Sequence, residues 1–240
     1  MLKAVIFDLD GTLYDYQAAH AAAWRALQDY ARAHLSVEPE RLDALHGRAF
    51  DLQKRRAGAP CAAIHDRLIR CQLMLELMGA PIGRAPEMAA LYWSVLLDAM
   101  RPFPGAAEAL DGLRAMGLAV GVGTNMTADY QFAKLERLGL MERVDFLVTS
   151  EEAGAEKPDP RLFALCAEKA GCAMEACAFV GDSLKGDVLG ALAAGMRAVW
   201  FRPDPLPEDE AAAPGAPRVA SLAALPALFA PIADPKELVP

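Results

Sequence analysis

The chain has 240 residues, of which 32 are acidic and 24 are basic, so its formal net charge at pH 7 is −8. A chain with this excess of acidic residues lacks the positive charge that binds a nucleic-acid polymer or an anionic membrane surface. We therefore expect a small molecule as the partner. No apolar run reaches the roughly 18 residues that a membrane span requires. The N-terminus enters a strand pattern without a signal sequence, so we expect a cytoplasmic protein.

The first predicted element is a short apolar strand over residues 4–7, "AVIF". It is followed at once by Asp8 and Asp10, two like charges one residue apart, and then by Gly11. On its own this stretch is explained equally well by a strand that ends in a polar Asp-Gly turn. Whether this stretch is only a turn or part of a ligand-binding site depends on what stands at the ends of the other predicted strands.

Residues 16–100 have the composition of helices, with many alanines, leucines and arginines and few β-branched residues. Prolines at positions 39, 60 and 81 divide this stretch into about four helices. The spacing of four, three, four and three residues predicts that one helical face carries Ile64, Leu68, Cys71, Leu75 and Met78.

Beyond residues 101–105, "RPFPG", short apolar runs alternate with helical stretches. We predict strands at 118–124, 146–149, 178–182 and 198–201, a loop over 204–217, and a last short strand near 219. Strands that alternate with helices form a parallel sheet covered on both faces. We therefore predict an α/β fold with a Rossmann-like parallel sheet, formed by residues 1–15 and 99–240, into which residues 16–98 insert an all-helical cap.

Polar residues stand at the carboxyl ends of the predicted strands, where parallel sheets bind ligands. Beside the first aspartate pair these are Thr124, Asn125, Asp182 and Asp187, and Lys157 precedes a proline between them. Carboxylates packed together repel one another unless a cation compensates them. Oxygen ligands of this kind suit Mg²⁺ and not zinc, so we expect Mg²⁺ as the cofactor.

Four stretches in this order, "DLDGTL", a strand-final threonine, "KPDP" and "GDSLKGD", resemble the four motifs of the haloacid dehalogenase superfamily. A helical insertion after the first motif is similar to the cap of its phosphatase branch. The resemblance implies that Asp8 is the nucleophile, which forms an aspartyl-phosphate, and that Asp10 is the general acid and base. Members that cleave carbon–halogen bonds lack an acid at the position of Asp10, so the resemblance favours a phosphatase over a dehalogenase.

The resemblance also assigns the binding residues. It implies that Mg²⁺ is held by Asp8, by the backbone carbonyl of Asp10 and by Asp182, with Asp187 and Ser183 one shell further out. It assigns the phosphoryl group to a second set of residues: Gly11, Thr124, Asn125 and Lys157.

These features predict a Mg²⁺-dependent phosphatase of a small phosphorylated metabolite. Residues 124–140 are similar to nucleoside 5′-monophosphate phosphatases, so a nucleotide is one candidate substrate. A phosphoglycolate-type or sugar phosphatase, a sugar phosphomutase and a catalytically silent phosphate-binding regulator stay open. In the cap, His20, Trp24, His46 and Arg48 are candidate substrate contacts, although ordinary packing or surface positions are the simpler interpretation for each.

Overall fold

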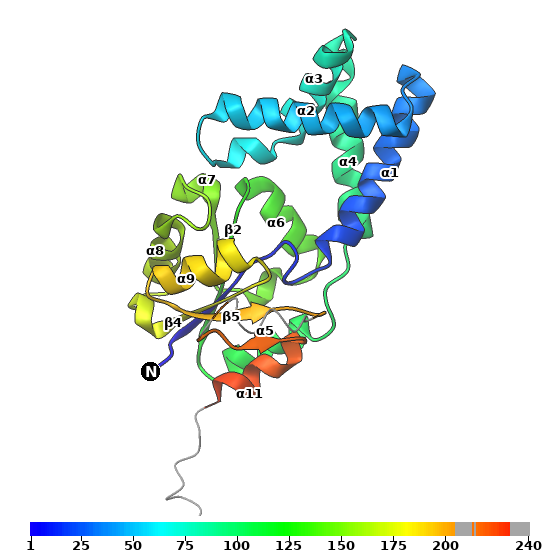
Figure 1. Cartoon of the computed structure of the whole chain (residues 1–240). Coiled ribbons are helices and arrows are strands. Elements are labelled where there is room, and N and C mark those ends of the chain that lie inside the picture. Colours follow the sequence, from blue (N-terminus) through cyan, green and yellow to red (C-terminus); the bar gives the residue numbers. More distant parts are fainter. Residues whose placement is uncertain (205–212, 214, 231–240) are drawn as a thin grey trace, which may run out of the picture.

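The structure, a computed structural model, describes residues 1–204, 213 and 215–230. Within these residues it contains a parallel sheet with helices on both faces and a block of helices above one edge of that sheet (Figure 1). The loop predicted over 204–217 lies largely outside the described residues. In the part of the chain that the structure describes, none of the helices combines the length and the apolar character needed to traverse a bilayer.

The sheet has six strands in the order β3-β2-β1-β4-β5-β6, and all neighbouring strands are parallel. The predicted α/β fold and all six predicted strands are confirmed. The first and last residues of β1 to β5 differ from the predicted ones by at most one residue. After β1 the chain adds β2 and β3 on one side of it, and then returns to add β4, β5 and β6 on the other side. The strands are β1 (Ala4–Phe7), β2 (Ala119–Thr124), β3 (Phe146–Thr149), β4 (Cys177–Gly181), β5 (Arg197–Phe201) and β6 (Arg218–Val219).

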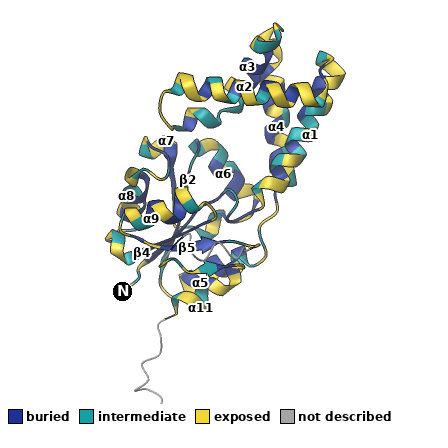
Figure 2. Ribbon diagram, in the orientation of Figure 1, coloured by how far each residue is buried: buried dark blue, intermediate teal, exposed yellow. Residues whose placement is uncertain are grey.

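Helices cover both faces of the sheet, as the almost fully buried strands require (Figure 2). On one face Val5 and Phe7 belong to a core that includes side chains of α5 and α6, and on the other Ile6 packs with side chains of α8 and α9. These core helices are α5 (Ala106–Ala115), α6 (Ala128–Arg137), α7 (Ser150–Ala153), α8 (Pro160–Lys169), α9 (Leu189–Ala193) and α11 (Leu225–Phe229).

The helical block (residues 16–99) follows β1 and lies above the core in Figure 1. Pro39 occupies the first helical position of α2, where a missing backbone N–H costs nothing, and the stretches around Pro60 and Pro81 separate the helices. Within the block α1 packs on α4 and α2 packs on α3. Its helices are α1 (Tyr16–Leu35), α2 (Pro39–Ala57), α3 (Arg67–Met78) and α4 (Ala85–Ala99), joined by the short turns η1 (Ala62–His65) and η2 (Ile82–Arg84).

The predicted apolar face over residues 64–78 is partly wrong. Ile64 lies in the turn η1, outside the helix, because the side chain of Asp66 caps the N-terminus of α3 by accepting from the backbone N–H of Ile69 at 3.0 Å. Leu68, in the first turn of α3, is exposed, whereas Cys71 and Leu75 are buried as predicted. A cap residue inside an apolar period therefore shortened the helix at its start.

Candidate active site

The first site element is Asp8, which follows β1 at the point where the sheet topology reverses between β1 and β4. Its backbone N–H donates to the carbonyl of Val180 in β4 at 2.9 Å, so the carboxylate is fixed at the edge where parallel sheets bind ligands. The Nζ atom of Lys157 lies 2.5 Å from Asp8 Oδ1 and 2.7 Å from Asp187 Oδ1. One buried ammonium thus lies between two buried carboxylates.

Three carboxylates meet around this ammonium. Oxygen atoms of Asp8, Asp182 and Asp187 all lie within 4.8 Å of one another. Burial raises the pKa of Asp8 to about 8, against the attraction of Lys157 and with further increases from Asp187 and Asp182. Loss of hydration and the charge of Asp187 raise the pKa of Asp182 to about 6, although part of this residue is open to solvent. The cluster therefore carries more negative charge than Lys157 alone compensates.

This donor set fits a divalent cation with a preference for oxygen. Asp8 and Asp182 follow the neighbouring strands β1 and β4 and present hard carboxylate oxygens, and the ligand group found among the described residues includes no histidine or cysteine, which suits Mg²⁺. Both oxygens of Asp187 already have partners, since Oδ1 pairs with Lys157 and Oδ2 accepts from the backbone N–H of Ser183 at 2.9 Å. Asp187 is therefore better placed to support the site than to bind the cation directly.

Glycines make these close approaches possible. Gly11 has φ of +90°, and a Cβ atom there would lie 2.6 Å from Asp182 Oδ2. A Cβ atom at Gly181 would lie 2.4 Å from the Cβ of Asp187, which reaches the cluster from the π-helical turn η5 (Leu184–Val188). Ser183 fixes the start of that turn, because its hydroxyl accepts from the backbone N–H of Gly186 at 3.1 Å.

Asp10 has its own set of partners, different from those of the carboxylate cluster. The Nζ atom of Lys134 lies 2.6 Å from Oδ1 and 2.9 Å from Oδ2, and Gln131 Nε2 donates to Oδ2 at 3.1 Å. The Tyr14 hydroxyl donates to Oδ1 as well. Burial alone would raise the pKa of Asp10, but Lys134 outweighs it, and the pKa is lowered. Asp10 is thus held as a carboxylate.

Two further predicted residues, Thr124 and Asn125, hydrogen-bond to segments around the carboxylate cluster. The hydroxyl of Thr124, at the end of β2, accepts from Gln131 Nε2 at 2.7 Å. The side-chain oxygen of Asn125 accepts from the backbone N–H of Lys157 at 2.9 Å. Thr124 and Asn125 therefore adjoin both lysine-bearing segments of the site.

Several site residues were missed by sequence reasoning: Thr12, Tyr14, Gln131 and Lys134. Gln131 and Lys134 lie one turn apart on α6, and a helical lysine 124 residues from Asp10 gives no signal of its own. Thr12 stands inside "DLDGTL", so its position next to the two aspartates was the available signal.

Thr12 provides a testable support for Asp182. Its buried hydroxyl accepts from the backbone N–H of Asp182 at 3.1 Å and donates to Asp182 Oδ1 at 3.3 Å. The Thr12→Val substitution removes this hydroxyl and leaves the Asp182 carboxylate free to rotate. It should weaken Mg²⁺ binding about 10- to 100-fold in a calorimetric titration. Thr12→Ser, which keeps the hydroxyl, is the matched control. Equal affinities in the two variants would show that Thr12 does not orient Asp182.

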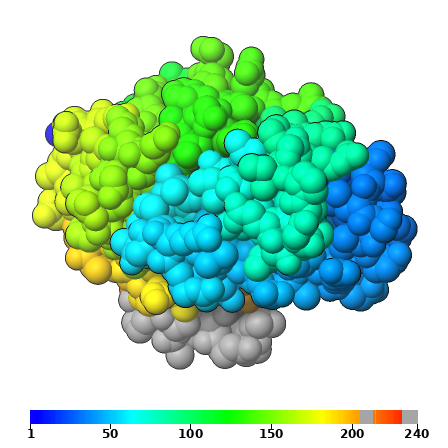
Figure 3. All heavy atoms as spheres, turned by 90° about the horizontal axis from the view of Figure 1, so that it is seen from above, coloured from blue at the N-terminus to red at the C-terminus, as the bar shows by residue number. Residues whose placement is uncertain are grey.

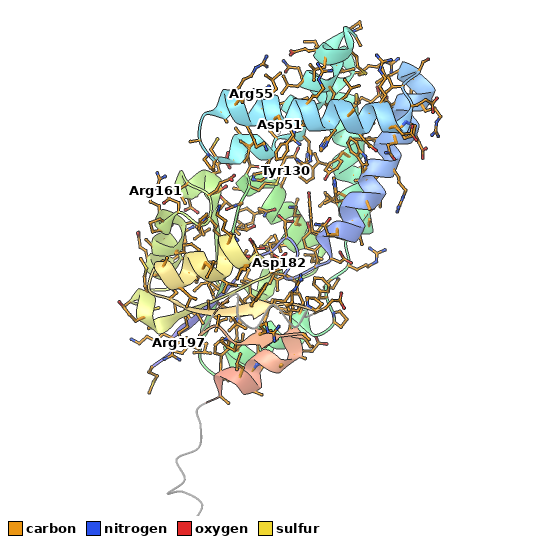
Figure 4. All side chains as sticks on the ribbon, in the orientation of Figure 1. Asp51, Arg55, Tyr130, Arg161, Asp182 and Arg197 are labelled. Carbon is orange, nitrogen blue, oxygen red and sulfur yellow. The ribbon has the colours of Figure 1, made fainter. Side chains whose placement is uncertain are left out.

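A cavity of about 690 Å³ lies between the carboxylate cluster and the helical block. Seen from above, atoms of the block cover the middle of the molecule (Figure 3), and in Figure 4 Asp182 lies on the side of the core that faces the block. The core wall of the cavity includes the predicted site residues of the strand ends. The wall from the helical block consists of Tyr16, Gln17, His65, Arg67 and Trp93.

The block candidates predicted from sequence do not line this cavity. The indole of Trp24 donates to Asp43 Oδ1 at 2.7 Å, and His20 Nδ1 lies 2.8 Å from the Tyr92 hydroxyl. His46 adjoins the Trp24 ring, and Arg48 is exposed. Packing within the block, the simpler interpretation, holds for the two histidines and the tryptophan.

Side-chain contacts join the block to the core beside the cavity. His65 Nε2 lies 2.9 Å from Glu156 Oε1, directly next to Lys157. The rings of Trp93 in α4 and Tyr130 in α6 stack at 3.8 Å between centroids, and in Figure 4 Tyr130 lies at the side of the core facing the block. The cavity is therefore bounded by side chains from both parts of the chain.

The fold and the site together define a class: an α/β protein with an acidic cluster at the switch point of a parallel sheet and a helical insertion above it. The sequence model of the haloacid dehalogenase-like hydrolase family matches residues 2–195 of this chain. The chain belongs to this family.

Relatives with assigned activities extend over most of the chain. It is 38% identical over 217 residues to a ribulose-1,5-bisphosphate 5-phosphatase of Halopiger xanaduensis, with 88% of each chain covered. It is 42% identical to a phosphoserine phosphatase of Thermus thermophilus, over 88% of this chain and 86% of that one. Among solved structures, a 2-haloacid dehalogenase of Pseudomonas syringae pv. Tomato superposes with a TM-score of 0.71 at 30% identity, over 96% of this chain and 99% of that one.

Proposed function

We propose that this protein is a Mg²⁺-dependent phosphatase that hydrolyses a small phosphorylated metabolite through an aspartyl-phosphate on Asp8. The observation that carries the proposal is the meeting of three carboxylates and one ammonium below a cavity of about 690 Å³. The assigned activities of the two relatives described above, both phosphatases, support the reaction type. We further propose that residues 16–98 act as a cap over the site.

The first half of the reaction forms the covalent intermediate. Asp8 attacks phosphorus, and the bond from phosphorus to the ester oxygen breaks. Lys157 and Thr124 bind the phosphoryl oxygens. Asp10, whose contacts favour the carboxylate, has to take up a proton before this step and then donates it to the departing alkoxide. Mg²⁺, held by Asp8, Asp182 and the backbone carbonyl of Asp10, would supply positive charge to the phosphoryl group.

The second half releases phosphate. Asp10 takes a proton from a water molecule that attacks the aspartyl-phosphate, and Asp8 departs as a carboxylate. The proton given to the leaving group is thereby regained, and the cycle closes. The contacts of Asp10 with Lys134 and Gln131 favour its ionised form, which is the form that this second step uses.

The alternatives differ in what happens to the phosphoryl group. A sugar phosphomutase would return it to another position of the same sugar, and a silent regulator would bind phosphate without turnover. The likeness to a haloacid dehalogenase of known structure makes halide release a further candidate. The carboxyl group present at position 10 of this chain supports the phosphatase, because an alkoxide needs a proton on leaving and a halide does not.

Removal of the metal provides the test. With p-nitrophenyl phosphate as the probe, EDTA should reduce hydrolysis to below about 1% of its Mg²⁺-supported value, because the phosphoryl charge and the acidic cluster are then uncompensated. Excess Mg²⁺ should restore the activity. Activity that persists in EDTA would overturn the proposal, as would the release of chloride from 2-chloropropionate without hydrolysis of any phosphate ester.

A further inference from the structure

Arg67, the first residue of α3, faces the cavity from the helical block without an acidic partner. Among the described residues its guanidinium donates to neutral oxygens: the carbonyl of His65 at 3.0 Å and the hydroxyls of Tyr16 and Tyr92 at 3.2 and 3.4 Å. None of the ion pairs found among the described residues includes Arg67. Its Nε atom is buried and has no hydrogen-bond partner.

A half-buried guanidinium without a carboxylate is costly to keep. Two aromatic rings lower this cost and fix the side chain, since its central carbon lies 4.9 Å from the ring centre of Tyr92 and 5.9 Å from that of Trp93. They do not neutralise the charge, and they leave the Nε donor unused. The arrangement holds a cation in place at the cavity wall.

The neighbouring charged groups of the described residues form no ion pair with Arg67. Arg70, one turn further along α3, lies 3.2 Å from His46 Nε2, and burial together with Arg70 lowers the pKa of His46 to about 4. Of the acidic residues in this region, Asp66, which directly precedes Arg67, caps α3 by accepting from the backbone N–H of Ile69, and Asp43 accepts from Trp24 and Gln28. Arg67 therefore presents to the cavity a cation that has no ion-pair partner among the described residues, opposite the acidic cluster at the strand ends.

We infer that Arg67 binds an anionic group, a carboxylate or a second phosphate, on the leaving-group part of the substrate. The inference rests on the proposed function, which sets the scissile phosphoryl group at Asp8 and directs the rest of the substrate toward the block. A guanidinium matches both anions through paired hydrogen bonds. Ribulose 1,5-bisphosphate and phosphoserine, the substrates in the names of two relatives, both keep an anion on the leaving group. A nucleoside is uncharged, so Arg67 favours the phosphoglycolate-type alternative over a nucleotide.

The test compares substrates with charged and uncharged leaving groups. The charged set is O-phosphoserine, 2-phosphoglycolate and ribulose 1,5-bisphosphate, and the uncharged set is glycerol 3-phosphate, uridine 5′-monophosphate and p-nitrophenyl phosphate. The wild type should prefer at least one charged member, and Arg67→Met should lower the ratio of kcat/KM for that member over the uncharged set about 10- to 100-fold. Arg67→Lys should recover part of the loss.

Arg70→Met is the matched control, because Arg70 is the other arginine of α3 and contacts Phe50, His46 and a backbone carbonyl, yet does not line the cavity. It should leave the substrate ratio unchanged. An equal loss on all substrates in Arg67→Met would assign Arg67 to packing and overturn the inference, as would a wild type that prefers uncharged leaving groups. Failure of every phosphate ester, p-nitrophenyl phosphate included, would instead overturn the proposed function.

Discussion

Asp8→Asn should abolish phosphatase activity, with a fall in kcat of roughly 10⁴-fold or more. An amide cannot form the acyl-phosphate bond, so the residual rate would reflect only binding and positioning by the rest of the site. The carboxylate that is lost lies 2.5 Å from Lys157 and inside the acidic cluster. The measurement is the initial rate of p-nitrophenyl phosphate hydrolysis at saturating Mg²⁺.

Folding must be separated from catalysis in this variant. Asn is isosteric with Asp and relieves repulsion from Asp182 and Asp187, so thermal unfolding of Asp8→Asn should remain cooperative. Asp98→Asn serves as the control, because Asp98 is exposed, pairs with Arg137 and does not line the cavity. Near wild-type turnover in Asp8→Asn would rule out the covalent route.

Lys157→Met should have the second largest effect, because it removes the one ammonium that lies between Asp8 and Asp187. The two buried carboxylates are then left uncompensated, which should lower the free energy of unfolding by about 3–5 kcal/mol without metal. Loss of a cation aimed at the phosphoryl group should also lower kcat about 10²- to 10³-fold. Denaturant titrations and initial rates measure the two effects.

The stability effect of Lys157→Met should depend on the metal. Since Mg²⁺ compensates the same carboxylates, its addition should stabilise Lys157→Met more than it stabilises the wild type. Lys185→Met is the control, because Lys185 lines the cavity but is exposed, and its loss should change stability little. If Lys157→Met were as stable as the wild type in EDTA, the charge balance described for the cluster would be wrong.

The fold could be predicted because its signals are local. An apolar run such as residues 4–7 reads as a buried strand in almost any context, and alternation with helices implies a parallel sheet. That inference also predicts which strand ends share an edge. The helix over residues 64–78 failed at its start because one capping side chain, Asp66, competed with an apolar period that continued through it.

For the site too, the residues placed by local signals could be predicted and those placed by tertiary packing could not. The carboxylates of the strand ends could be predicted to lie together because strand topology alone brings Asp8 close to Asp182. Lys134 and Arg67 could not be predicted, because each is an ordinary helical residue until tertiary packing turns it toward the cavity. The simpler interpretation of His20, Trp24 and His46 was the right one, because their helix faces pack inside the block.

The central claim is that Asp8 carries the phosphoryl group during turnover. Enzyme turning over p-nitrophenyl phosphate with Mg²⁺ can be quenched with sodium borohydride, which reduces an acyl phosphate to the alcohol, and the peptides can be identified by mass spectrometry. The account predicts homoserine in place of Asp8, formed only when substrate and Mg²⁺ are both present. Sustained turnover with Asp8 unmodified, or reduction at a different carboxylate, would contradict it.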